Sequence, residues 1–365
     1  MRFILLLFVC CICVVACDKN PQAKAALHQN HIRHQEDTIG FAQYSWQMDS
    51  IISRMDDADK LPNSETYKAV ICPHDDYGYA GGLYYKTLSG IKAKTIILVG
   101  VAHRARNFDL QDRIIFGSYD SWQSPDGIIP VSSLRDKLLP KLNKKTYVVH
   151  DSMMQLEHSL EAITPFLKRK NPALEIIPML VPYNTFQNMQ LFSDDIGSGI
   201  AALMKEENLI YGKDIAVVIS NDAIHYGSEG WGSGNLAPFG TDSSGTAQAR
   251  QKDLDIVKET LQGELTTKRV QKFNEITIMA DDYKSYKWTW CGRYSTPFGL
   301  LLANRIEQLT GASNKDGKLP HLTGTFIDWR SSIHNTHIKV DDLRMGHTAQ
   351  ADSTHWVAYI GMSYQ

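Results

Sequence analysis

The sequence has almost no excess of charge of either sign. Its 38 Lys and Arg and 40 Asp and Glu give a formal net charge of -2 over 365 residues. A protein that holds a phosphate backbone needs an excess of positive charge, so we expect no nucleic acid partner. The remaining composition, 43% hydrophobic and 21% charged, is that of a globular protein with enough apolar material for a sizeable core.

Long apolar runs are also scarce. The longest, from Phe3 to Ala16 after Arg2, is too short to span a bilayer as a helix but has the length of a signal-peptide core. It ends at Cys17, and the tetrapeptide from Val14 to Cys17 has the small-residue pattern of a lipobox. We therefore predict a signal peptide over residues 1–17 with a lipidated Cys17, which anchors the protein to a membrane on the extracytoplasmic side of a bacterial cell envelope. The alternative is an apolar N-terminal helix of the folded domain.

Cysteine is scarce outside this segment. The chain has six cysteines, and only Cys72 and Cys291 lie beyond Cys17. Two thiols in a protein of this size do not form a disulfide framework. Each of the two therefore needs its own explanation.

Residues 18–37 are polar and lack apolar periodicity, so we interpret them as a tether between the lipid and the domain. Their three histidines, His28, His31 and His34, are spaced so that they could bind a metal weakly, but solvated tether residues are the favoured interpretation. No linker rich in Gly, Ser or Pro and no internal repeat interrupts the rest, which predicts one domain over residues 38–365.

Within residues 38–365, short apolar runs alternate with longer amphipathic segments. The runs predict buried strands at 68–72, 94–100, 114–116, 147–150, 176–181 and 215–220. The amphipathic segments predict helices near 83–89, 131–142, 154–167, 186–204, 248–261 and 298–309. This alternation predicts an α/β fold with a mainly parallel sheet flanked by helices. The segment 227–245, rich in Gly and Ser, is expected to be a long surface loop.

Histidines follow three of the predicted strands. His74, His103 and His225 come directly after apolar runs, and Asp222 precedes the last of them by three residues. In open α/β sheets ligands gather at the carboxyl ends of the strands. A single histidine there is more often structural, but several histidines and carboxylates at equivalent strand ends should converge on a functional site.

Five segments resemble, in the same order along the chain, motifs of the Memo family, also called AmmeMemoRadiSam system protein B. Pro73-His74-Asp75-Asp76-Tyr77 resembles the family's Pro-His-Ala-Gly-Tyr, and Val99-Gly100-Val101-Ala102-His103 resembles its Leu-Gly-Pro-Ser-His. Glu157-His158-Ser159-Leu160-Glu161 resembles its Glu-His-Ser-Ile-Glu, and Ser220-Asn221-Asp222-Ala223-Ile224-His225 resembles its Ser-Ser-Asp-x-x-His. Cys291-Gly292-Arg293 matches its Cys-Gly-Arg. Each motif is weak alone, but five in one order are hard to obtain by chance.

The resemblance implies a fold shared with class III extradiol dioxygenases and a site for iron or copper. Position by position, it makes His74, His103 and Cys291 metal ligands and places Asp222 and His225 in the same pocket. The donor types agree with this, since two imidazoles and a thiolate suit a borderline-soft ion such as iron, copper or zinc and leave positions open for water, oxygen or substrate.

Proton transfer beside the metal would need a further group. Asp222 and His225 could both point into the pocket, where one would donate or accept the proton. His158 is a second candidate. Its alternative role is structural, at the start of a helix, because Glu157 and Ser159 are typical helix-start residues.

The sequence departs from the family pattern next to the first histidine, where Asp75 and Asp76 replace Ala-Gly. One of them could join or orient the metal shell, although solvated turn residues are the favoured interpretation. Cys72 lies two residues before His74, on the same side of the strand. A disulfide with Cys291 could switch the metal off, but a small buried thiol is the favoured interpretation.

We expect a redox-active iron or copper oxidoreductase that acts on a small molecule. The pattern weakens the interpretation as a dioxygenase, because a thiolate replaces the carboxylate of the usual iron-binding triad. A zinc-dependent hydrolase with the same ligands and a lipoprotein that binds a ligand without catalysis are the alternatives.

Overall fold

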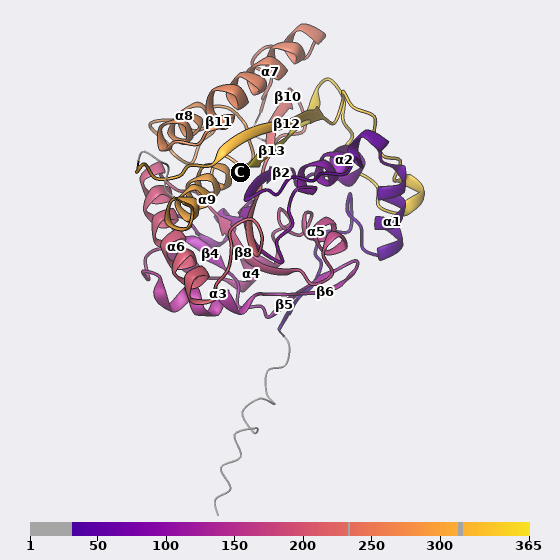
Figure 1. Cartoon of the computed structure of the whole chain (residues 1–365). Coiled ribbons are helices and arrows are strands. Elements are labelled where there is room, and N and C mark those ends of the chain that lie inside the picture. The colour runs from indigo at the N-terminus through magenta and orange to yellow at the C-terminus, as the bar shows by residue number, and fades with distance from the viewer. Residues whose placement is uncertain (1–30, 233, 313–316) are drawn as a thin grey trace, which may run out of the picture.

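The computed structural model describes residues 31–232, 234–312 and 317–365. These residues form an α/β domain in which helices cover both faces of a ten-stranded mixed sheet, with a separate three-stranded sheet at one end (Figure 1). The predicted signal peptide, Cys17 and residues 18–30 of the predicted tether lie outside the described residues. No helix within the described ranges is both long and apolar enough to cross a membrane.

Four parallel strands form the centre of the large sheet, in the order β2, β9, β3 and β8. They are β2 (Ala69–Cys72), β9 (Ile215–Ser220), β3 (Thr95–Val101) and β8 (Glu175–Val181). Nearly every residue in them is buried, as expected for strands covered on both faces. Cys72 pairs with Ser220, and Val101 pairs with Val181, so the carboxyl ends of the four strands lie along one edge.

The prediction of a mainly parallel sheet is not confirmed, because the sheet is mixed: its centre is parallel, but the remaining strands join mostly antiparallel. β13 (His355–Tyr364) pairs antiparallel with β2, and β12 (Thr323–Ser331) and β10 (Asp222–Gly227) both pair antiparallel with β13. β11 (Gly263–Glu264) lies next to β12 at one edge of the sheet. β4 (Ile114–Phe116) and β7 (Tyr147–Val149) follow β8 at the other edge. β12 mixes buried, half-buried and exposed residues and has no continuous apolar run, so its sequence does not predict a buried strand.

Two groups of helices cover the two faces of the sheet (Figure 1). One group consists of α3 (Ser133–Leu138), α6 (Phe186–Glu206), α7 (Ser243–Ile256), α8 (Thr267–Thr277) and α9 (Ser295–Thr310). The other consists of α1 (Ser45–Arg54), α2 (Tyr77–Leu88), α4 (Asp151–Gln155) and α5 (Thr164–Lys170). Successive residues of a strand point to opposite faces, and accordingly Ile71 belongs to the core under α6 and α9, while Val70 and Cys72 belong to the core under α2.

The first described residues are part of the domain, which corrects the predicted end of the tether at residue 37. Strand β1 (Ile32–Arg33) pairs with β5 (Ser121–Ser124), which pairs with β6 (Gly127–Pro130). The Arg33 side chain is fully buried, forms an ion pair of 2.5 Å with Glu161 and stacks on Trp122. Charged and polar contacts attach this segment, which is why its sequence shows no apolar periodicity.

Candidate metal centre

The structure brings His74, His103 and Cys291 together at the carboxyl edge of the parallel strands. His74 follows β2, His103 follows β3, and Cys291 lies in the turn that leads into α9. The Cys291 Sγ atom is 2.8 Å from His103 Nε2 and 3.6 Å from His74 Nε2. The three donor atoms all lie within 4.8 Å of one another.

Hydrogen bonds fix which nitrogen of His74 is free. Ser220 Oγ donates to the main-chain carbonyl of Ser159 (2.8 Å), so its oxygen is left to accept from the Nδ1–H of His74 (2.8 Å). The Nε2 lone pair therefore points toward Cys291. Burial lowers the pKa of His74 well below its usual value, which keeps the ring neutral, as a ligand must be.

His103 is oriented by Glu157 in the same way. The Glu157 carboxylate accepts from the main-chain N–H of His103 (2.7 Å) and from its Nδ1 (2.8 Å). Burial alone would raise the pKa of Glu157, but the adjacent His103 lowers it to about 2. An ionised carboxylate on the far nitrogen fixes the ring orientation and makes Nε2 a stronger ligand.

Cys291 completes a donor set that fits a metal ion. Burial raises the pKa of its thiol to about 12, although Arg293 acts in the opposite direction, so the thiol is protonated unless another positive charge is close. A metal ion would supply that charge. For comparison, the zinc–sulfur and zinc–nitrogen bonds of tetrahedral protein sites, about 2.3 and 2.0–2.1 Å long, place S and N about 3.6 Å apart. The Cys291–His74 spacing already has this value, while the Cys291–His103 spacing is shorter and would have to widen.

Asp222 and His225 lie beside this donor set, as the sequence predicts. Asp222 accepts from the main-chain N–H of His74 (2.9 Å), and its other oxygen is 3.3 Å from His74 Nε2. His225 has a buried Nε2 without a hydrogen-bond partner among the described residues. Burial first, and the adjacent His103 second, lower its pKa to about 3.

His158 also lies at the site, but not at the start of a helix. The helix predicted over 154–167 is interrupted, because α4 ends at Gln155 and α5 begins at Thr164. The Nδ1 of His158 is 2.9 Å from the Asp37 carboxylate, and its ring centroid is 4.9 Å from that of His103. His103, Glu157 and His158 form a second group of close donor atoms, but Glu157 already holds His103 through Nδ1, so we favour the group that contains Cys291.

A cavity of about 260 Å³ opens beside the donor set. Its wall contains His74, His103, His158, Asp222 and His225, together with Asp75, Tyr79, Trp231, Ser332, Thr348, Ala349, Gln350, Ala351, His355, Trp356 and Val357. His355 stacks on Trp231 at a centroid distance of 3.9 Å. Neither His355 nor Trp231 could be assigned a role from the sequence, because neither lies in a recognisable ligand spacing.

The interpretation of Asp75 and Asp76 as solvated turn residues is wrong. Asp76 is fully buried and accepts from the N–H (2.7 Å) and hydroxyl (3.0 Å) of Thr348. Asp75 accepts from the hydroxyl of Tyr359 in β13 (2.6 Å). Neither belongs to a group of converging donor atoms, so their role here is to attach the C-terminal part of the chain beside the candidate ligand His74.

Cys72 and Cys291 are both free thiols in this structure. Cys72 is fully buried among apolar side chains under α2. It therefore packs as a small hydrophobic residue, the favoured interpretation of the sequence.

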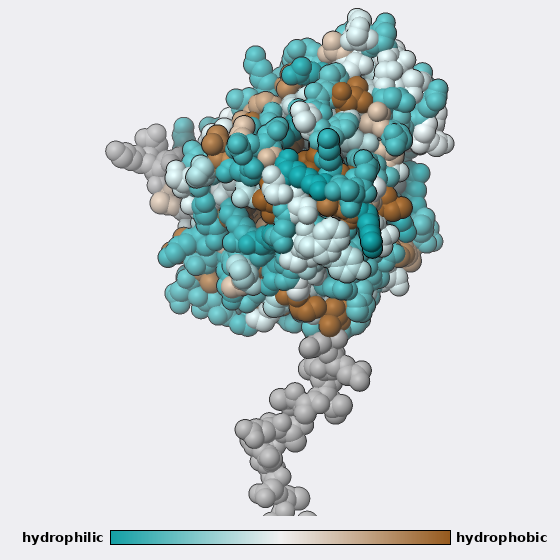
Figure 2. Space-filling view, turned by 90° about the vertical axis from the view of Figure 1, so that its right-hand side faces the viewer, coloured by the Kyte–Doolittle hydropathy of each residue, from teal (hydrophilic) through white to brown (hydrophobic). Residues whose placement is uncertain are grey.

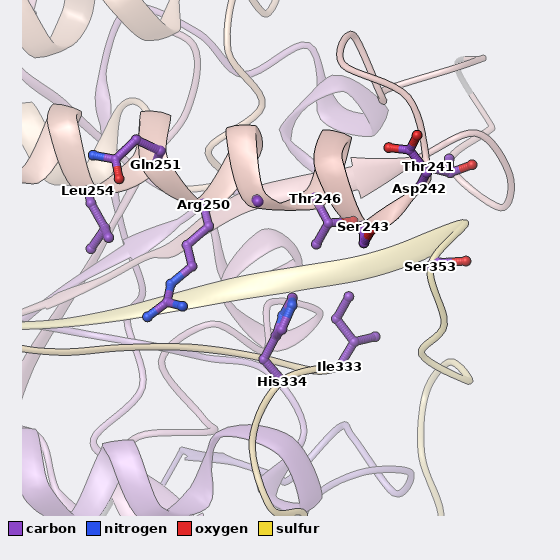
Figure 3. A pocket seen from close by; sticks show the side chains of 11 residues that line it. Thr241, Asp242, Ser243, Thr246, Arg250, Gln251, Leu254, Ile333, His334 and Ser353 are labelled. Atoms are coloured by element: carbon purple, nitrogen blue, oxygen red, sulfur yellow. The ribbon is translucent and has the colours of Figure 1, made fainter.

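A larger cavity lies elsewhere. It has a volume of about 650 Å³ and lies between α7 and the segment that contains Ile333 and His334 (Figure 3). Arg250 extends into it from α7, and no residue in its wall belongs to a group of converging metal donors. Size alone therefore does not identify the site.

The sequence is similar to proteins of one family. A family model described as Memo-like protein matches residues 42–322, a range that contains all three donor residues. A MEMO1 family protein of Pyrococcus abyssi is 22% identical over 280 residues, which are 74% of this chain and 84% of the relative. The corresponding protein of Pyrococcus furiosus is 24% identical over 277 residues, again 74% and 84%. A MEMO1 family protein of Aquifex aeolicus is 30% identical over 134 residues, 35% of this chain and 34% of the relative.

Proposed function

The chain belongs to the Memo family, and on this basis we propose that it is a redox-active metalloprotein, an oxidoreductase with iron or copper at its centre. The observation that carries the proposal is the convergence of His74 Nε2, His103 Nε2 and Cys291 Sγ within 4.8 Å. We also propose that its fold is related to that of the class III extradiol dioxygenases.

The three donors would hold the ion through two neutral imidazoles and one thiolate. An iron or copper ion in such a site supplies redox chemistry and an open coordination position. Iron and copper both accept nitrogen and sulfur donors, which supports them over magnesium or calcium. The thiolate would also supply negative charge that two neutral imidazoles do not provide.

The other residues of the cavity would bind the substrate and handle protons. His225 presents a neutral ring with an unpartnered Nε2, which is available to hydrogen-bond a substrate. Asp37 holds Nδ1 of His158, which leaves Nε2 of that ring for a proton. Asp222 is close enough to His74 to fix its orientation. A cavity of about 260 Å³ is small among ligand sites, which favours a small-molecule substrate.

Metal content and spectroscopy test the redox proposal. Protein purified under reducing conditions should contain iron or copper, and its electronic and electron paramagnetic resonance spectra should change when oxygen or a reductant is added. Zinc alone, without a spectral response, would defeat the proposal and favour a zinc-dependent hydrolase, because the same two nitrogens and one sulfur suit zinc. Full metal occupancy without turnover of any substrate would favour a binding protein.

We further propose that lipid on Cys17 attaches the protein to a membrane of the cell envelope. The support is the apolar run that ends in Val14-Val15-Ala16-Cys17. In cells fed a clickable palmitate analogue, the wild type should carry the label and fractionate with membranes. Cys17→Ala should lose both properties, while the control Cys72→Ala should keep them. Equal labelling of wild type and Cys17→Ala would contradict the anchor.

A further inference from the structure

A third cavity, of about 440 Å³, lies where α1, α2 and α5 meet, and it shares no residue with the cavity beside the candidate metal centre. Figure 2 views this side of the molecule and shows hydrophobic residues exposed between hydrophilic ones. The apolar part of its wall consists of Ile52, Leu61, Pro62, Tyr85, Leu88 and Phe166. Its volume lies within the range of small-molecule sites.

The charged part of the wall is entirely positive. Lys60, Lys92, Arg169 and Lys170 line the cavity, and no carboxylate does. Arg169 is paired with Asp126 and Asp49, and Lys60 with Asp57. Within the described part of the chain, Lys92 and Lys170 form no ion pair.

Lys92 and Lys170 instead converge on the main-chain carbonyl of Ser89, at the end of α2. Lys92 Nζ donates to the carbonyls of Asn63 (2.8 Å) and Ser89 (3.1 Å). Lys170 Nζ donates to the carbonyls of Leu88 (2.8 Å) and, again, Ser89. The partial negative charge at a helix C-terminus stabilises a cation, but two ammonium groups that share one carbonyl also repel each other.

This arrangement leaves both ammonium groups able to bind an anion. Each has three N–H donors and uses two, so each retains one donor. Burial and the neighbouring Lys92 lower the pKa of Lys170 to about 8, as expected for a cation that lacks a counterion. An anion that accepts from both would relieve their repulsion and form charge-assisted hydrogen bonds.

We propose that this cavity binds a small amphiphilic anion, a carboxylate or sulfonate with an apolar body about the size of one or two rings. The anionic group lies between Lys92 and Lys170, and the body lies against Leu88 and Phe166. The larger cavity in Figure 3 fits such a ligand less well, because Asp242 shares its wall with Arg250.

The test is a titration of the full chain with 2-naphthoate, followed by calorimetry, beside the neutral analogue 2-naphthalenemethanol. The wild type should bind the carboxylate and bind the alcohol about tenfold more weakly. The double variant Lys92→Met/Lys170→Met should lose about tenfold in affinity for naphthoate and none for the alcohol.

Two further variants separate the site from general charge and from misfolding. Lys168→Met is the matched control, because Lys168 is on α5, binds the carbonyl of Pro172 (2.7 Å) and does not line the cavity. It should bind as the wild type does. Leu61→Ser, at a side chain that is 67% exposed, should weaken both ligands without loss of stability. No binding by the wild type, or equal affinity in the double variant and Lys168→Met, would overturn the proposal.

Discussion

Glu157 accepts two hydrogen bonds from one residue, His103: one from its main-chain N–H and one from its Nδ1. The backbone contact fixes the position of the residue, and the ring contact fixes its tautomer and rotation. The Nε2 atom is thereby held toward Cys291 before any ion binds. Glu157 comes from the irregular segment between α4 and α5, so that segment contributes directly to the geometry of the donor set.

Substitution Glu157→Gln should weaken metal binding by about 10- to 100-fold, because the side chain keeps its shape but loses the charge that orients and polarises His103. Competition with a chelator measures the affinity. Glu264→Gln, at an exposed position away from the site, is the control and should bind as the wild type does. An unchanged affinity in Glu157→Gln would show that the carboxylate does not support the ligand.

Arg33 should be essential for stability, although it lies in the segment whose sequence suggests a tether. Arg33→Met leaves the buried Glu161 carboxylate without its counter-charge and should lower the free energy of unfolding by about 3–5 kcal/mol. Chemical denaturation measures the change. The control Arg54→Met breaks an exposed pair with Asp342 and should leave stability almost unchanged. Similar stability in both variants would mean that residues 31–37 do not belong to the domain.

Asp253 is a buried carboxylate that joins three tryptophans. Its side chain accepts from the indole N–H groups of Trp288 (3.0 Å), Trp290 (2.7 Å) and Trp329 (3.4 Å). Burial raises its pKa to about 6, although the three indoles act in the opposite direction. Trp290 directly precedes Cys291, so Asp253 links α7 and β12 to the segment that carries the Cys291 thiol.

The raised pKa predicts a pH-dependent stability. The folded state binds the Asp253 proton more tightly than the unfolded state, whose pKa is about 3.9. Its contribution is therefore complete below about pH 4 and is lost as the pH rises through about 6, by roughly 3 kcal/mol in total. The stability of the wild type relative to Asp253→Asn should fall over this window. Urea denaturation at several pH values measures it, and a constant difference would contradict the raised pKa.

The central strands could be predicted from the sequence because burial on both faces leaves an unbroken apolar run. The predicted bounds of β4 and β9 agree with the structure. The predicted bounds of β3 differ from it by one residue at both ends, and those of β8 by one residue at the first end. β12 and β1 could not be predicted in this way, because β12 has a half-exposed face and β1 has only two residues.

The metal donors could be predicted because two of them follow such strands and the third matches a family motif. The surroundings of these donors could not be predicted. The amphipathic pattern over 154–167 predicted a continuous helix, but Glu157 accepts from the N–H of Ser159 (3.0 Å) and Ser159 Oγ donates to the carbonyl of Val101 (3.0 Å). Such side-chain bonds to the backbone compete with a helix. Contacts such as His355 with Trp231 join distant parts of the chain and leave no local pattern.

The central claim is that His74, His103 and Cys291 bind one metal ion, and elemental analysis of matched variants tests it most directly. We predict about one metal equivalent per chain in the wild type and in the controls Cys72→Ala and His321→Ala, which alter a cysteine and a histidine outside the donor set. His74→Ala and Cys291→Ala should lose the metal while they remain folded by circular dichroism. Full metal content in both of these variants would contradict the account.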